Sequence, residues 1–146
     1  MYVIDSSVHV ADARPQAPHH SEARALLAHL AAEERAVYLP EIVLAEIAAA
    51  ISRGTGERAL AQRLVAALRR IPHFHYVPID DVLGDLAASL AAEYQIRGCD
   101  AVYVALARHQ GLRLITLDRQ QRKRVPPDVA ACTPAEELDR LNQRPE

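Results

Sequence analysis

Short apolar segments alternate with longer Ala- and Leu-rich segments along almost the whole chain, and this alternation restricts the fold more than any other feature. The short segments have the β-branched and apolar residues of strands, and they lie at residues 2–4, 37–39, 75–77 and 112–116, with an edge strand at 129–131. The longer segments have apolar residues at helical spacing, and they predict helices at 8–13, 21–32, 41–53, 57–71, 80–94 and 101–109, with a last one opening at 133–136.

Strands that are joined through helices run parallel, and helices then cover both faces of the sheet. We therefore predict an α/β fold with a central parallel sheet of four to five short strands. The 146 residues suffice for one hydrophobic core, and no repeat or linker interrupts the pattern. Only 4% of the residues are aromatic, so the core must be built from aliphatic side chains. We place a single domain at residues 1–141 and a frayed tail at 142–146.

The sequence gives no sign of a membrane or secreted protein. No apolar run approaches the roughly 20 residues of a membrane-spanning helix, and residues 1–5 lack the basic start and long apolar stretch of a signal peptide. Cys99 and Cys132 are far apart and form no metal-type pair, which suits a reducing compartment. We expect a cytoplasmic protein.

Two acids stand at the ends of predicted strands. Asp5 follows the first strand, and Asp118 comes just after the strand that ends at Thr116, with Leu117 between them. Ligands of open parallel sheets bind beyond the carboxyl ends of the strands, so both acids are candidate site residues. Ser7 and Thr116 add hydroxyl groups at the same strand ends, where they can hold a ligand or a metal-bound water.

Two further acids lie on predicted helices among apolar neighbours. Asp100 opens an apolar helix, and Glu46 lies within an apolar stripe because its neighbours at helical spacing are Ile42, Val43, Ala49 and Ala50. An unpaired carboxylate is costly to bury. Glu46 must therefore be protonated, paired with a base or held by a cation.

Each acid also has an ordinary structural interpretation. Asp5, Asp100 and Asp118 all stand where Asp can cap the start of a helix, and Glu46 can form a salt bridge with an arginine. The candidate ion-pair partners are the arginines on either side of Asp100, which are Arg97 and Arg108.

A single hypothesis accounts for all four acids together. Carboxylates that converge repel one another unless a cation neutralises them, and oxygen ligands without His or Cys suit magnesium or manganese and not zinc. Clustered acids with a divalent ion favour the attack of water on a phosphodiester, because the metal lowers the pKa of water and offsets the charge of the phosphate.

In their order along the chain, these residues resemble the PIN domain. The motifs are Asp5-Ser6-Ser7 after the first strand, Glu46 in the helix after Pro40, Asp100-Ala101 at the start of an apolar helix, and Thr116-Leu117-Asp118 after a strand. The resemblance covers almost the whole chain. Among PIN proteins, the short single-domain form is similar to the VapC-type toxins of toxin–antitoxin systems.

This resemblance implies a magnesium-dependent endoribonuclease, with manganese as the alternative ion, whose products carry a 5′-phosphate and a 3′-hydroxyl. It assigns the principal metal ion to Asp5, Glu46 and Asp100, the role of the fourth acid to Asp118, and support of the metal site to Ser7. It also implies a homodimer, and a small cognate antitoxin whose C-terminal segment lies over the active-site groove and keeps the enzyme inactive.

The stretch from residue 119 to 124 departs from many members of that family, which have a bulky apolar or aromatic residue a few positions after the fourth acid. Its cations predict contacts with RNA phosphates, and the alternative is a solvated loop; they are Arg119, Arg122, Lys123 and Arg124. The net charge of −2 gives the chain no general attraction for nucleic acid. RNA binding would therefore depend on local patches or on metal.

Other functions fit the sequence less well. A haloacid-dehalogenase-like phosphatase would use Asp5 as its nucleophile, but that mechanism needs a second Asp at the position where Ser7 stands. A dinucleotide-binding site would need a Gly-rich loop after the first strand. The strongest alternative is a non-catalytic PIN-like module that binds RNA or protein. Such modules usually lose acids, and this chain has all four.

Overall fold

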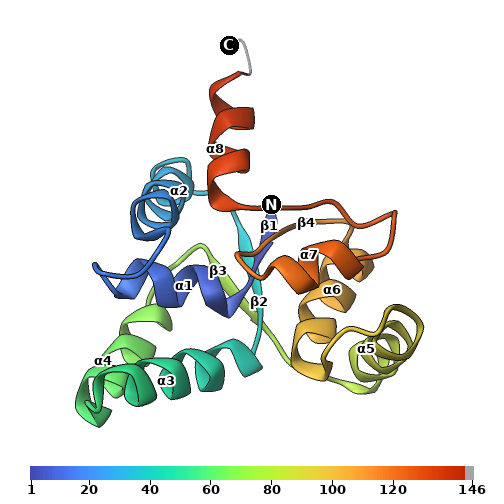
Figure 1. Ribbon diagram of the computed structural model, residues 1–146, viewed down its shortest axis with the longest axis horizontal. Coiled ribbons are helices and arrows are strands. Elements are labelled where there is room, and N and C mark those ends of the chain that lie inside the picture. The colour runs from blue at the N-terminus through green and yellow to red at the C-terminus, as the bar shows by residue number, and fades with distance from the viewer. Residues whose placement is uncertain (144–146) are drawn as a thin grey trace.

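The computed structural model describes residues 1–143. Its centre is a parallel sheet with the strand order β3-β2-β1-β4-β5 (Figure 1). The strands are β1 (Tyr2–Ile4), β2 (Val37–Pro40), β3 (Phe74–Val77), β4 (Arg113–Ile115) and β5 (Ala131–Cys132). The predicted α/β fold with one parallel sheet flanked by helices is confirmed.

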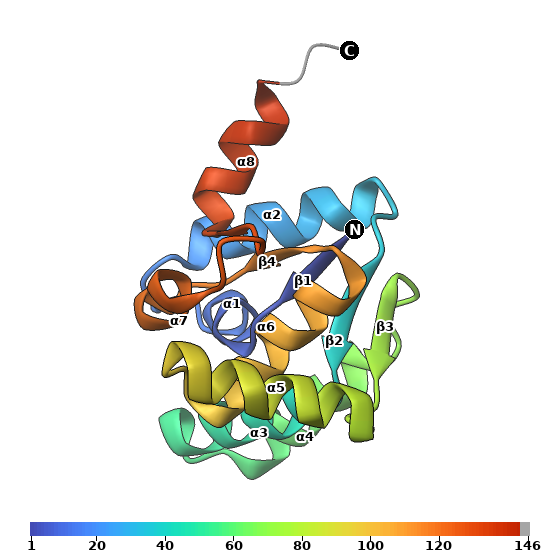
Figure 2. The ribbon, with the colours of Figure 1, turned by 90° about the vertical axis from the view of Figure 1, so that its right-hand side faces the viewer.

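Helices cover both faces of the sheet. They are α1 (Ser6–Ala13), α2 (His20–Ala32), α3 (Ile42–Thr55), α4 (Arg58–Leu68), α5 (Asp81–Tyr94), α6 (Gly98–Gln110), α7 (Arg119–Arg124) and α8 (Pro134–Asn142). Helices α1 to α4 lie on one side of the sheet, and α5 and α6 lie on the other (Figures 1 and 2). Among residues 1–143, every helix is too short or too polar to traverse a lipid bilayer.

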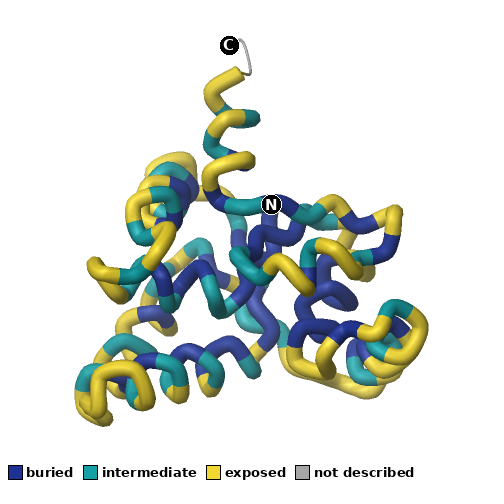
Figure 3. The backbone as a smooth tube through the Cα atoms, in the orientation of Figure 1, coloured by how far each residue is buried: buried dark blue, intermediate teal, exposed yellow. Residues whose placement is uncertain are grey.

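Helix α6 is the most deeply buried of the helices. Every residue from 100 to 107 is buried, and the helix packs directly on β1, β2 and β4. Figure 3 shows this buried helix and the central strands surrounded by helices with exposed outer faces. A helix that is apolar on all sides belongs in a core, so the acid in its first turn, Asp100, is held on a rigid element.

The observed element boundaries differ from the predicted ones at places with a clear physical reason. Helix α4 ends at Leu68 and not at residue 71, because Pro72 follows and disfavours helical backbone at the residue before it. The edge strand lies at 131–132, since Ala131 and Cys132 are the residues in register with β4. The basic stretch 119–124 forms helix α7 and not a loop.

The last element that the structure describes is helix α8, and it includes the first residue of the predicted frayed tail. Helix α8 ends at Asn142, one residue beyond the predicted domain end at 141. Residues 144–146 of the predicted frayed tail lie outside the described residues.

Candidate active site

Four acids from four elements meet at the carboxyl edge of the sheet. Asp5 follows β1, Asp118 follows β4, Glu46 lies on the helix after β2, and Asp100 lies in the first turn of α6. Their charges act on one another, since Asp100 and Asp118 raise the pKa of Asp5, and Asp5 and Asp100 raise the pKa of Glu46. The structure therefore brings together the four acids that the sequence identified.

Asp5 caps a helix and also belongs to the acid cluster. Asp5 is only 4% exposed, and its Oδ2 accepts a hydrogen bond of 2.9 Å from the backbone N–H of Ser7 at the start of α1. Burial raises the pKa of Asp5, and the two neighbouring acids raise it further against the hydrogen bonds from Ser7. The N-cap interpretation is thus correct, but it does not exclude a role in the site.

Glu46 is half-buried, and its partner is neither a base nor a second acid. The hydroxyl of Tyr103 donates a hydrogen bond to Glu46 Oε2. Burial raises the pKa of Glu46, and this hydrogen bond partly offsets the rise. Tyr103 was not identified from the sequence, although a tyrosine within the apolar stretch of this helix needs a partner for its hydroxyl, and it stands three residues after Asp100 on the same face.

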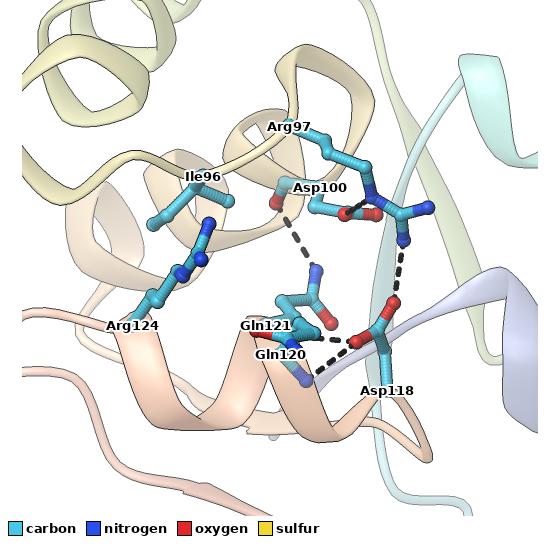
Figure 4. A pocket seen from close by; sticks show the side chains of 7 residues that line it. All are labelled: Ile96, Arg97, Asp100, Asp118, Gln120, Gln121 and Arg124. Atoms are coloured by element: carbon cyan, nitrogen blue, oxygen red, sulfur yellow. Dashed lines mark hydrogen bonds and ion pairs between the residues drawn. The ribbon is translucent and has the colours of Figure 1, made fainter.

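One arginine bridges the other two acids. Arg97 Nε lies 2.7 Å from Asp100 Oδ2, and Arg97 Nη2 lies 2.5 Å from Asp118 Oδ2 (Figure 4). Burial raises the pKa of Asp100, although Arg97 works against the rise. The ion pair considered for Arg97 is confirmed. Arg108 instead pairs with Asp128 at 2.8 Å, because eight residues of helix put it about 12 Å along the axis from Asp100.

The two hydroxyl groups named from the sequence fix the segment that carries Asp118. Ser7 Oγ accepts a 3.1 Å hydrogen bond from the N–H of Leu117, and Thr116 Oγ1 accepts a 3.0 Å bond from the N–H of Asp118. Thr116 is fully buried. Both side chains therefore support the site through the backbone of the turn after β4.

Gln121 connects two of the acids and was not identified from the sequence. Its Nε2 donates a 3.1 Å hydrogen bond to the backbone carbonyl of Asp100, and its own N–H donates a 3.0 Å bond to Asp118 Oδ1. The side chain is 1% exposed, and its Oε1 has no hydrogen-bond partner. This glutamine holds the short helix α7 against the start of α6, in the stretch that departs from the family pattern.

A cavity of about 220 Å³ opens beside Asp100 and Asp118. Figure 4 shows its lining residues, which are Ile96, Arg97, Asp100, Asp118, Gln120, Gln121 and Arg124. Of the cations proposed to contact RNA, Arg124 lines this cavity and donates a hydrogen bond to the carbonyl of Gln95. Arg122 lies 3.7 Å from Glu136, and Arg119 and Lys123 are exposed.

The chemistry of the donor set fits a hard divalent cation. The site consists of carboxylate oxygens, and burial and mutual repulsion raise the pKa of three of them, so each would gain from a cation nearby. As they stand, no three His, Cys, Asp or Glu side chains within residues 1–143 form a ready-made metal-binding group. The two carboxylates nearest the cavity are instead turned to Arg97.

Comparisons with known proteins agree with this fold. The sequence matches the PIN domain family over residues 2–125, and no protein of curated function matches it. Similar solved structures include Mycobacterium tuberculosis VapC20, a sarcin–ricin loop cleaving toxin, with 21% identity over 89% of this chain and 99% of that chain and a TM-score of 0.73.

Two further solved structures have the same fold. VapBC2 from Rickettsia felis, bound to a promoter DNA fragment, has 17% identity over 90% of this chain and 97% of that chain, with a TM-score of 0.70. FitAcB from Neisseria gonorrhoeae has 24% identity over 92% of this chain and 99% of that chain, also with a TM-score of 0.70.

Proposed function

Because the chain belongs to the PIN domain family, we propose that it is a metal-dependent endoribonuclease and the toxin of a type II toxin–antitoxin pair. The observation that carries this proposal is the convergence of Asp5, Glu46, Asp100 and Asp118 at the carboxyl edge of the sheet. Four acids with one arginine between them leave an excess of negative charge that a structural ion-pair network would not need.

In this proposal, Asp5, Glu46 and Asp100 hold a magnesium ion, or manganese, and Asp118 is the fourth ligand. When bound, the ion activates water for attack on the RNA phosphodiester and offsets charge on the phosphate. The chain's own groups prepare the ligands. The N–H of Ser7 fixes Asp5, the hydroxyl of Tyr103 orients Glu46, and the buried stretch of α6 from residue 100 to 107 fixes Asp100.

The substrate side of the proposal depends on helix α7. Arg119 and Lys123 are exposed on it, and Arg124 lines the cavity next to Asp118. We assign RNA phosphate contacts to these cations and to Arg122, since phosphates are bound chiefly by Arg and Lys. A local basic helix supplies this attraction in a chain whose net charge is −2.

The proposed partners are a small cognate antitoxin and a second copy of the chain, in the cytoplasm. Support for the antitoxin comes from the structural neighbours, one of which is a toxin–antitoxin complex from Klebsiella pneumoniae. The homodimer and the cytoplasmic location are expectations from the family resemblance.

The test of the nuclease function is cleavage of a structured RNA by the purified protein with Mg²⁺ or Mn²⁺. Asp5→Asn and Asp100→Asn should each reduce the rate at least about 100-fold, and EDTA should abolish cleavage. The matched control is Asp128→Asn, an exposed acid whose partner is Arg108 and not a site residue. In cells, the wild-type chain should arrest growth unless the antitoxin is supplied, and Asp5→Asn should not.

A non-catalytic RNA- or protein-binding module is the second candidate. The observation that favours it is the salt bridge of Arg97 with two of the acids, which neutralises part of the cluster without metal. Such a module would bind RNA equally well with and without magnesium and would not cleave it. Cleavage by Asp5→Asn at the wild-type rate would reject the nuclease proposal.

A further inference from the structure

Arg97 occupies the position in the acid cluster where a positive charge is most needed. Its guanidinium contacts Asp100 at 2.7 Å and Asp118 at 2.5 Å, and its charge also acts on Glu46 and on Asp5 through mutual attraction. One cation on the chain thus serves all four acids. This is the electrostatic role that the proposed function gives to the divalent ion.

We propose that Arg97 is a resident counter-ion of the acid cluster, and that a divalent metal ion must displace its guanidinium from Asp100 and Asp118 in order to bind. This inference rests on the proposed function, because it concerns the same four acids. It makes Arg97 a residue that weakens metal binding and stabilises the metal-free protein.

The contacts of Arg97 suit a group that can be displaced. Its side chain is 72% exposed, whereas the side chains of Asp100 and Asp118 are 13% and 22% exposed. Arg97 also lies at the N-cap position of α6 and makes no side-chain capping bond there. The acids are therefore fixed by the fold, and the arginine reaches them from solvent through ion pairs of the exposed and weak kind.

Competition predicts a definite effect on metal affinity. The apparent affinity equals the intrinsic affinity multiplied by the fraction of molecules in which the carboxylates are free. Exposed ion pairs each change an equilibrium by about threefold to fivefold, so two of them together should weaken divalent metal binding by about tenfold. Removing Arg97 should therefore tighten metal binding, even though it removes a residue from the site.

The experiment measures Mn²⁺ and Mg²⁺ binding to EDTA-stripped full-length protein by isothermal titration calorimetry, and free Mn²⁺ by electron paramagnetic resonance. Arg97→Gln should bind both ions about tenfold more tightly than the wild type. The matched control is Arg108→Gln, on the helix that Arg97 precedes; Arg108 Nε lies 2.8 Å from Asp128. It removes the same charge from an ion pair outside the acid cluster and should bind as the wild type does.

Thermal unfolding gives a second readout that needs no catalysis. In EDTA, Arg97→Gln should melt below the wild type because the acids lose their counter-ion, and it should gain more from added Mn²⁺. If Arg97→Gln fails to fold, Arg97→Lys takes its place. A single ammonium cannot bridge two carboxylates as the planar fork does, so this variant should bind metal more tightly than the wild type, by less than tenfold.

Each other outcome overturns the inference in a recognisable way. Weaker metal binding by Arg97→Gln would mean that Arg97 positions the acids for the ion. Unchanged metal binding with weaker RNA binding would mean that Arg97 is a phosphate contact. If the wild type binds neither ion, the proposed function is overturned as well. If the wild type binds metal and cleaves RNA but Arg97→Gln does not bind metal more tightly, only this inference fails and the proposed function stands.

Discussion

Two clusters of carboxylate and guanidinium groups lie at opposite ends of β1, and they differ in the ratio of arginines to acids. At one end, Glu137 of α8 is fully buried against two arginines: Arg140 Nε lies 2.8 Å and Arg113 Nε 3.5 Å from its Oε2. At the other end, Arg97 is the one arginine within residues 1–143 that forms an ion pair with the four acids, through Asp100 and Asp118. One acid has two cations in the first cluster, and four acids have one in the second.

The two ratios of arginines to acids shift the pKa of the acids in opposite directions. Burial alone would raise the pKa of Glu137, but the hydrogen bonds from Arg140 and Tyr2 and the nearby arginine charges bring it below its usual value. In the acid cluster, burial and like charges leave the pKa of Asp5, Glu46 and Asp100 raised. The first cluster is complete by itself and fastens α8 to the sheet, whereas the second has room for another cation.

The largest test of this difference is the loss of Glu137. Glu137→Gln removes the acid that, within residues 1–143, pairs with both arginines. Leaving the two guanidinium groups without this partner should lower the free energy of unfolding by about 2 kcal/mol, less than for a fully buried pair because both arginine side chains are about one-third exposed. Chemical denaturation at neutral pH measures this change. Asp139→Asn, an exposed acid on the same helix, is the control and should change stability by less than about 0.5 kcal/mol. An equally small effect of Glu137→Gln would mean that α8 is not held by these ion pairs.

The sequence shows only part of this difference. Glu46 has apolar neighbours at helical spacing, whereas Glu137 stands on a largely polar helix with Arg140 three residues on, a spacing that suits an ion pair. Local pattern was enough to predict the strands, the helices that join them and the four acids at the carboxyl edge, since each of these follows from the alternation of elements along the chain. What separates the clusters is the cations that the fold brings to each acid.

Those cations and supporting groups depend on tertiary contacts, which no local pattern specifies. Arg97 stands three residues before Asp100, so that ion pair could be expected, but its contact with Asp118 spans 21 positions. The hydrogen bond from Tyr103 to Glu46 spans 57 positions. Gln121 and helix α7 were missed because their order comes from contacts with Asp100 and Asp118 and not from an apolar face.

A second test removes an acid from the unbalanced cluster and should have the opposite sign. In EDTA at pH 7, Glu46→Gln should stabilise the protein by about 1 kcal/mol, or roughly 3 °C in Tm, because it removes a half-buried charge that Asp5 and Asp100 repel. Glu93→Gln, at an exposed site, should leave stability unchanged. A loss of stability in Glu46→Gln would show that the cluster is already balanced.

The pH dependence of this pair of variants follows from the direction of the Glu46 shift. Its folded pKa is raised above the usual 4.5, so the folded state binds a proton more tightly than the unfolded state. The stability this gives is complete below about pH 4.5 and is lost as the pH rises through the folded pKa. The advantage of Glu46→Gln should therefore vanish in acid. For Glu137, whose pKa is lowered, the wild type's advantage over Glu137→Gln should shrink as the pH falls below the usual value.

The smallest expected change in stability is at Gln121, where the acid cluster has an unpartnered buried oxygen. Gln121→Leu loses the hydrogen bond to the carbonyl of Asp100, worth about 1 kcal/mol, and also removes the buried Oε1 that has no partner, whose burial costs a similar amount. The free energy of unfolding should change by less than about 0.5 kcal/mol.

Cleavage of RNA by Gln121→Leu should still fall about threefold to tenfold, because Asp118 is then less firmly held relative to Asp100. Gln120→Leu changes an exposed neighbour that also lines the cavity; it keeps the connection through Gln121 and the backbone N–H that bonds to Asp118, and it should retain the wild-type positions of both acids. If Gln121→Leu cleaves RNA at the wild-type rate, the bond to Asp100 is a packing contact only, and the turn after β4 positions Asp118 without it.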